Sequence, residues 1–159
     1  MNNNRTTIPE SEKFAMRFRG TVHDLRSVKF YTNKNSIQIK KQISFDSESA
    51  QISSIEYFAA SLLSSILLTL LEQSKKQEVL IEDIEGVLKF SLENPLSLVG
   101  VKGYEEEPSI RQMNVTIFLY AHLDDDHFEI FCNEALQKSP LYNTFKRSME
   151  LDVVFKNIV

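Results

Sequence analysis

The sequence contains a single cysteine, Cys132, and no tryptophan among its 159 residues. One cysteine excludes an intramolecular disulfide, and it also excludes a cysteine-rich zinc site or a dithiol redox couple within one subunit. Glycine and proline are scarce as well, with 4 of each. The remaining composition, 42% hydrophobic and 25% charged, is that of an ordinary globular protein. A chain of this length can bury a core that needs no disulfide or metal for its stability.

The sequence also lacks a net positive charge and an apolar segment near its N-terminus. The net charge is −4, and the lysines and arginines are spread along the chain, which argues against nucleic-acid binding. Residues 1–12 are polar and have no apolar core like that of a signal peptide, so we expect a cytosolic location. The sequence thus predicts a flexible N-terminus over residues 1–12 and a single domain over residues 13–159.

One long apolar run raises the question of a membrane. Residues 57–71 carry no charge, but Glu56 and Glu72 flank them and the run is shorter than the roughly 20 residues that a bilayer requires. Its residues are apolar on nearly every face of a helix, which is typical of a central helix covered on several sides. Ser53 or Ser54 is expected to cap this helix. The sequence therefore predicts a buried helix and no membrane contact.

Alternating apolar and polar residues precede this helix. Residues 14–19, 28–31 and 37–43 each show the period of two that is typical of a half-buried strand, and residues 32–35 form a polar turn between the last two. These segments predict an N-terminal antiparallel β-meander. After the helix, residues 79–92 are again rich in strand formers, and Gly86 is expected to mark a bulge or bend.

The last third of the chain alternates strands and helices. Residues 113–120 carry bulk on both faces and predict a central strand, while residues 150–159 predict a final strand. Three aspartates, Asp124 to Asp126, precede an amphipathic helix, and we assign them to helix capping in preference to metal binding with the adjacent His127. Ser139 and Pro140 are expected to start another short helix. The order of elements predicts an α+β fold.

Two segments together resemble the OsmC/Ohr family, the osmotically inducible and organic hydroperoxide resistance proteins. SIEYFAASLLSS at residues 54–65 is similar to that family's central-helix pattern, approximately P-x-E-L-L-x-A-A-L-x-S-C. SPLYNT at residues 139–144 is similar to its second motif, roughly C-P-x-x-x-T. The order of elements agrees over about nine tenths of the chain. The resemblance implies an OsmC-like fold, an intertwined homodimer and sites at the subunit interface.

The resemblance also implies where catalytic thiols would stand. The enzymes of the family reduce organic hydroperoxides with a peroxidatic and a resolving cysteine, which become a sulfenic acid and then a disulfide. Here Ser65 and Ser139 occupy those two positions. Glu56 matches a family glutamate that lowers the thiol pKa. The family arginine could correspond to one of three residues, namely Arg17, Arg19 and Arg26.

Two residues offer other chemistries, which we weigh against simpler roles. Cys132 lies on an amphipathic helix among apolar residues, so packing is favoured over a role as nucleophile. Ser65 as a hydrolytic nucleophile would need a histidine base, and His23, His122 and His127 lie in other contexts. The hydroxyls of Ser64 and Ser65 are instead expected to bond carbonyls one turn earlier or to line an interface cavity.

The sequence thus predicts an OsmC-like homodimer without thiol peroxidase activity, which binds a small apolar ligand at the dimer interface. It predicts no cofactor, metal, nucleic acid or membrane partner. Two alternatives stay open: a hydroperoxide reductase whose cysteines are replaced by serine, and a purely structural dimer. The residues expected to line the site are Glu56, Tyr57, Phe58, Ser61, Ser65 and Ser139.

Overall fold

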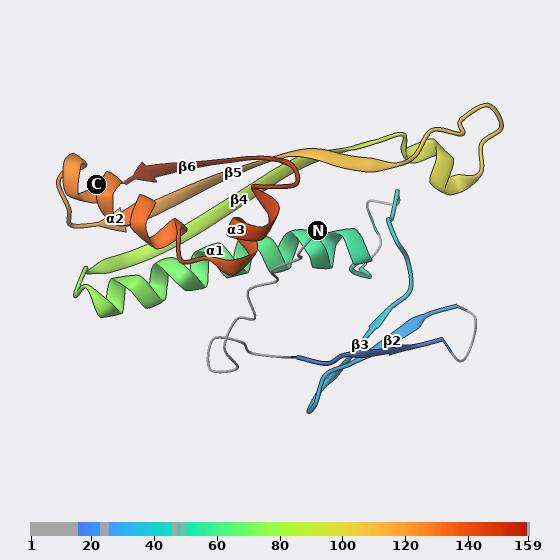
Figure 1. Cartoon of the computed structure of the whole chain (residues 1–159), viewed down its shortest axis with the longest axis horizontal. Helices are drawn as coiled ribbons and strands as arrows, with labels where there is room; N and C mark the ends of the chain where they lie inside the picture. Colours follow the sequence, from blue (N-terminus) through green and yellow to red (C-terminus); the bar gives the residue numbers. More distant parts are fainter. Residues whose placement is uncertain (1–15, 23–25, 46–47, 49, 159) are drawn as a thin grey trace, which may run out of the picture. The chain divides into compact units, whose positions relative to one another are not determined.

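A computed structural model describes residues 16–22, 26–45, 48 and 50–158. The chain forms two compact units, residues 1–56 and residues 57–159. Strands and helices alternate along it in the α+β manner that the sequence predicts (Figure 1). The long helix α1, Ser54–Lys76, begins in the first unit and continues into the second.

The N-terminal unit contains the predicted β-meander. Strands β1 (Arg19–Thr21), β2 (Val28–Tyr31) and β3 (Ser36–Ile39) form an antiparallel sheet in the order β1-β2-β3. The polar turn between β2 and β3 is closed by the Thr32 N–H, which donates to the Asn35 carbonyl over 2.8 Å. The prediction for strands two and three is therefore confirmed, although β3 ends at Ile39 and does not reach residue 43.

The first strand overlaps its prediction over residues 14–19 only at Arg19. Residues 14 and 15 lie outside the described residues, and residues 16–18 are not a strand, because β1 begins at Arg19, opposite Tyr31 of β2. Pairing begins at Arg19 because its partner strand β2 ends at Tyr31. The alternation of apolar and polar residues does not reveal the end of the partner strand. Phe18 still contacts this sheet, since its ring stacks on Phe30 at 5.3 Å between centroids.

A reciprocal pair of hydrogen bonds caps the start of α1. The Ser53 hydroxyl accepts from the Glu56 N–H over 3.3 Å, and the Glu56 carboxylate accepts from the Ser53 N–H over 2.7 Å. This is a capping box, which satisfies two N–H groups that a helix start otherwise leaves without partners. Of the two predicted caps, Ser53 is the one that the structure uses.

The C-terminal unit is a three-stranded sheet with helices on one face. Strand β4 (Ile81–Glu93) pairs antiparallel with β5 (Ser109–Ala121), and β6 (Glu150–Asn157) pairs parallel with β5. The order β4-β5-β6 makes β5 the central strand, as predicted. The remaining elements of this unit are a 3₁₀ helix, η2 (Pro95–Val99), and two α-helices, α2 (Asp125–Leu136) and α3 (Pro140–Phe145).

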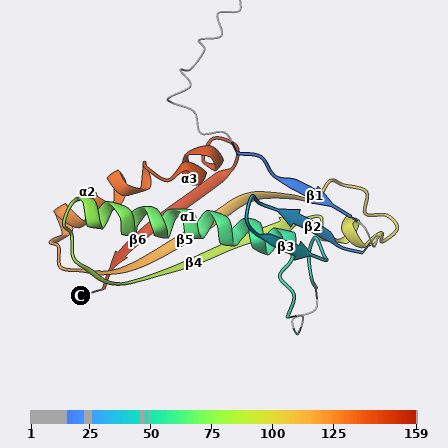
Figure 2. The ribbon, with the colours of Figure 1, turned by 90° about the horizontal axis from the view of Figure 1, so that it is seen from below.

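The core lies between this sheet and the three helices. Helix α1 and the α2–α3 pair cover the same face of the sheet in both views of the ribbon (Figures 1 and 2). The apolar side chains with no exposed surface come from α1, β5 and α2: Leu62, Ile66, Leu70, Met113, Ile117, Leu119 and Ala135. This shared burial is the main source of stability of the unit.

Within its own chain, helix α1 is covered on one face, and the predicted coverage on several sides stays a prediction for the homodimer. Leu68 is 57% exposed and Leu71 is 38% exposed, on the side away from the buried Ile66. By length and composition α1 could cross a membrane, but core helices have the same properties. Its buried face packs on the sheet of its own chain, as a core helix does.

Gly86 has a different role from the predicted bulge. The register of β4 is regular at Gly86, and its irregularities lie between Ile81 and Asp83 and between Phe90 and Leu92. A Cβ atom on Gly86 would come within 2.7 Å of Leu63 Cδ1. The glycine thus allows α1 to approach the middle of β4 closely, a requirement that becomes visible only in the tertiary structure.

Candidate functional site

The two serines that the resemblance singles out lie in contact. Ser65 on α1 and Ser139 between α2 and α3 place their hydroxyl oxygens 3.1 Å apart, and either hydroxyl can donate. The two residues are far apart in the sequence and meet because α1 and the α2–α3 pair share one face of the sheet. The structure therefore brings together the two residues that the resemblance matches to thiol positions.

Local sequence explains the position of Ser139. Pro140 is the first residue of α3 and fits there because its missing N–H needs no partner. Ser139 is the N-cap of that helix, and its hydroxyl accepts from the Tyr142 N–H over 3.4 Å. The side chain has no exposed surface. The Ser139 hydroxyl is thus buried with two polar partners, which removes the free-energy penalty of an unpaired buried group.

The other predicted site residues lie on α1. Phe58 packs edge-on against Phe145 of α3, with 5.0 Å between ring centroids. The Ser61 hydroxyl donates to the Phe58 carbonyl over 2.7 Å and is exposed. The Ser64 hydroxyl donates to the Ser61 carbonyl over 3.1 Å, which confirms the prediction for Ser64. Tyr57 is half-buried.

The carboxylate of Glu56 accepts a hydrogen bond within the capping box at the start of α1. The Ser53 hydrogen bonds hold the pKa of its exposed carboxyl below the ordinary value. The carboxylate therefore stabilises the helix start. The role as a site residue that the sequence assigns to Glu56 remains a prediction.

Cys132 is buried in the core, as predicted. It is 1% exposed and belongs to the cluster that contains Phe131 and Ala135. Burial raises the pKa of its thiol to about 12, because the apolar surroundings disfavour the thiolate. A thiol that stays protonated at neutral pH is a poor nucleophile.

The histidines of the described residues are paired with carboxylates. His122 Nε2 lies 2.6 Å from Glu82 Oε1, and His127 Nδ1 lies 2.7 Å from Asp124 Oδ2. The Asp124 carboxylate also accepts from the His127 N–H at the start of α2, which confirms the predicted cap. His23 lies outside the described residues. Within the described part of the chain, the bonds of Ser65 thus include no histidine base for a hydrolase.

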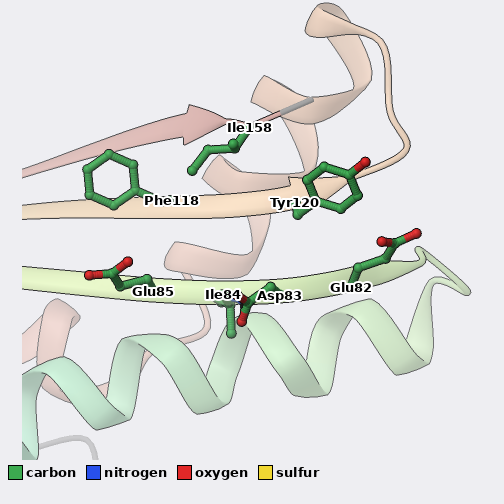
Figure 3. Close-up of a pocket in the computed structure, with 7 residues that line it drawn as sticks. All are labelled: Glu82, Asp83, Ile84, Glu85, Phe118, Tyr120 and Ile158. Carbon is green, nitrogen blue, oxygen red and sulfur yellow. Dashed lines mark hydrogen bonds between the residues drawn. The ribbon is translucent and has the colours of Figure 1, made fainter.

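An open pocket of about 440 Å³ lies on the sheet, away from this serine pair. Figure 3 shows that Phe118, Tyr120 and Glu85 lie on one side of the ribbon while Ile84 points toward α1. Ser65 and Ser139 are not part of its lining. Among the residues described, no group of three or more histidine, cysteine, aspartate or glutamate side chains could hold a metal ion.

The fold is similar to solved structures over nearly the whole chain. An OsmC-like protein from Mycoplasma pneumoniae aligns with a TM-score of 0.73 and 9% identity, over 92% of this chain and 99% of that one. The chain has the OsmC-like fold. An organic hydroperoxide resistance protein from Elizabethkingia anophelis aligns with a TM-score of 0.68 and 9% identity, over 92% and 98% of the two chains.

A third similar structure is that of a protein from Psychrobacter arcticus described as a putative osmotic stress induced and detoxification response protein. It aligns with a TM-score of 0.65 and 15% identity, over 91% of this chain and 98% of that one. No protein-family model and no curated protein matches the sequence. At these identities the OsmC-like fold is shown, while the activity has to be argued from the residues.

Sequence reasoning missed two parts of the site. Phe145 and the Tyr142 N–H both contact predicted site residues; Tyr142 lies within the motif at residues 139–144, and Phe145 directly follows it. The proline at the first helical position predicts that Ser139 is an N-cap, so the bond from Tyr142 was available as a signal. The contact between the rings of Phe145 and Phe58 depends on how α3 packs on α1, so the sequence carried no signal for it.

Proposed function

We propose that this OsmC-like protein does not act as a thiol peroxidase and that its Ser65–Ser139 pair is a structural hydrogen bond. The observation that carries the proposal is the 3.1 Å contact between the two hydroxyls, at the positions where the family enzymes carry thiols. Sulfur would have to be oxidised to a sulfenic acid at one position and condense with a thiol at the other. Serine cannot follow that cycle.

The bonding of Ser139 supports the structural role. A reactive group has to be reached by its substrate, but Ser139 has no exposed surface and is bonded to both Ser65 and the Tyr142 N–H. The pair joins α1 to the start of α3. We infer that it does so by hydrogen bonding and packing alone.

We further propose that the protein is a homodimer that pairs through the exposed face of α1. This face carries Leu68 and Leu71, and no charge interrupts it between Tyr57 and Leu71. An exposed apolar stripe of this length is unfavourable in water unless a partner covers it. Within one chain Ser139 has no exposed surface that a ligand could contact. A site for the predicted apolar ligand would therefore need residues from the second chain.

The peroxidase claim is tested by a coupled assay with cumene hydroperoxide and dithiothreitol. The unchanged protein should consume the hydroperoxide no faster than its Cys132→Ser variant, and neither should exceed the rate without protein. Turnover that persists in Cys132→Ser and disappears in Ser65→Ala would overturn the proposal, because it would make the serine pair catalytic.

The dimer is tested by sedimentation at micromolar concentration. We expect about twice the 18.4 kDa chain mass. Leu68→Lys should shift the protein toward monomer, since it places a charge in the proposed interface. Leu80→Lys is the matched control, because Leu80 is 63% exposed and follows the end of α1. A monomeric unchanged protein, or equal effects of both variants, would contradict the proposal.

A further inference from the structure

The open pocket on the C-terminal sheet is lined by two aromatic rings. Phe118 and Tyr120 alternate with buried core residues along β5, so the two rings lie on the face of the sheet opposite the helices (Figure 3). Ile158 lies on the same side and adds an apolar side chain. The volume of about 440 Å³ is sufficient for a small organic ligand.

An acidic residue of β4 stands opposite each ring. Glu85 pairs directly with Phe118, and Asp83 pairs directly with Tyr120. A β-bulge just before Asp83 inserts Glu82 as an extra residue, which adds a third carboxylate to the lining. Among the described residues that line the pocket, none is lysine or arginine, so the lining attracts cations.

Two of these carboxylates keep oxygen atoms available for a ligand. Glu85 is exposed and forms no ion pair within the described part of the chain. Asp83 accepts from the Ile84 N–H over 2.8 Å with Oδ1, which leaves Oδ2 available. Glu82 is engaged by His122 over 2.6 Å. Glu85 and Asp83 are therefore the two acidic residues that can bind a ligand directly.

An ammonium group of the protein itself already lies against one of the rings. Lys156 of β6 pairs with Phe118 on the side opposite Glu85, and its Nζ atom lies 5.4 Å from the centroid of the Phe118 ring. At this distance a cation is attracted by the face of an aromatic ring. The ring is thus placed to accept a cation, and a cationic ligand would compete with Lys156 for it.

A second acidic hollow, on helix α2, lacks this combination. It is lined by five residues, none of which is aromatic: Asp126, Glu129, Ile130, Asn133 and Glu134. Carboxylates on an exposed helix face are screened by water and salt, and they attract cations weakly. The pairing of rings with carboxylates, and not negative charge alone, therefore distinguishes the pocket on the sheet.

We propose that this pocket binds a linear organic diamine. One ammonium group lies at Phe118 and Glu85, the other lies at Tyr120 and Asp83, and the alkyl chain spans the two rings. The two pairs of ring and carboxylate are two residues apart along the strands, which corresponds to about 7 Å and matches the span of a short diamine. The pocket is on the face of the sheet away from α1, so the proposal depends neither on the dimer nor on the serine pair.

An NMR titration of the full chain with cadaverine, a five-carbon diamine, tests the proposal, with pentylamine and pentanediol as the two partial ligands. Cadaverine should shift the backbone amide signals of residues 83–85 and 118–120. It should bind more tightly than pentylamine, which has one charge, and pentanediol, which has none, should not bind. Asp83→Asn/Glu85→Gln should weaken cadaverine about fivefold or more. Added salt should weaken cadaverine in the same direction.

Three further variants separate the pocket from general effects of charge and of folding. Glu129→Gln/Glu134→Gln removes the same charge from the exposed face of α2 and should leave cadaverine binding unchanged. Phe118→Leu removes the ring but keeps an apolar side chain, and it should weaken binding. Lys156→Gln should tighten binding about twofold or more, because it removes the competing ammonium group. No signal shifts at the pocket, equal binding of cadaverine and pentylamine, equal losses in the two acidic pairs, or unchanged binding in Phe118→Leu or Lys156→Gln would each overturn the proposal.

Discussion

The part-buried Ser65–Ser139 contact and the buried Cys132 both lie in the C-terminal unit, and each lacks a feature that the other has. The serine pair has two side chains from different elements in contact, with a 3.1 Å separation of their oxygens. Cys132 has the sulfur, but its pKa is raised to about 12 and it is the one cysteine of the chain. Thiol peroxidase chemistry needs both features at one place.

This difference shows that the fold positions a pair independently of the chemistry of that pair. Ser139 is held as an N-cap with proline after it, and Ser65 is held by its place on α1 next to the buried Ile66. Neither requirement involves sulfur. The arrangement can thus be kept by hydroxyl groups, which hydrogen-bond where thiols would react.

Replacing both serines of the pair by cysteine should give the largest change, a gain of hydroperoxide reductase activity. In Ser65→Cys/Ser139→Cys the two thiols would stand within reach of each other, so we expect an internal disulfide under oxidising conditions. Hydroperoxide reduction should rise by about a hundredfold or more over the unchanged protein, since removal of a catalytic nucleophile costs enzymes even more. The assay is the coupled one with cumene hydroperoxide.

The control for this gain is Ser64→Cys/Ser139→Cys. Ser64 is the neighbour of Ser65, but its hydroxyl is bonded to the Ser61 carbonyl of its own helix. It should therefore neither form the disulfide nor gain activity. Equal rates for both double variants would show that the 3.1 Å contact does not mark a place for thiol chemistry.

The thiol of Cys132 should be nearly inert in the folded protein. A pKa of about 12 in place of 9.0 reduces the thiolate at pH 8 by about a thousandfold, and burial also blocks access. An aromatic disulfide reagent should thus label the native protein at least about a hundredfold more slowly than the protein in denaturant. Similar rates in both states would place Cys132 in an open site.

Removal of the Ser139 hydroxyl should destabilise the protein. Ser139→Ala leaves the Tyr142 N–H without its cap and Ser65 without its partner, at a cost of about 1–2 kcal/mol in the free energy of unfolding. Ser65→Ala should cost about half of that. The double variant should cost less than the sum, by about 0.5 kcal/mol or more, because the two hydroxyls stabilise each other.

Chemical denaturation measures these values. Ser148→Ala is the control, because its exposed hydroxyl donates to the Phe145 carbonyl and joins no two helices. Additive losses for Ser65→Ala and Ser139→Ala would contradict a coupled pair.

The smallest expected effect is that of the two capping carboxylates on how stability depends on pH. Hydrogen bonds lower the folded-state pKa of Glu56 and of Asp124 below their ordinary values of 4.5 and 3.8. The unfolded chain therefore takes up these protons first, so this stabilisation is complete above those values and is lost as the pH falls below them. Glu56→Gln/Asp124→Asn should reduce the fall in melting temperature between pH 6 and pH 3. An unchanged fall would contradict the capping roles.

Much of the fold follows from local signals in the sequence. Ser53, Asp124 and Ser139 stand before helices in patterns that predict N-caps, and all three cap in the structure. The start of β1 and the role of Gly86 could not be predicted, because they depend on the length of β2 and on the approach of Leu63.

The candidate site was only partly predictable. The resemblance pairs Ser65 with Ser139, but their hydrogen bond depends on how α1 packs beside the α2–α3 pair. Of the two alternatives predicted for the Ser65 hydroxyl, the return to a carbonyl of its own helix is replaced by this contact, and the interface cavity stays a prediction.

The most direct test of the central claim is a single treatment of the native protein with cumene hydroperoxide in the presence of dimedone, which traps sulfenic acids. The sole thiol is buried and the serine pair cannot be oxidised through this cycle, so we expect no dimedone adduct on the unchanged chain. Ser65→Cys is the positive control and should be labelled at residue 65. Rapid labelling of Cys132 in the native, unchanged protein would contradict the account.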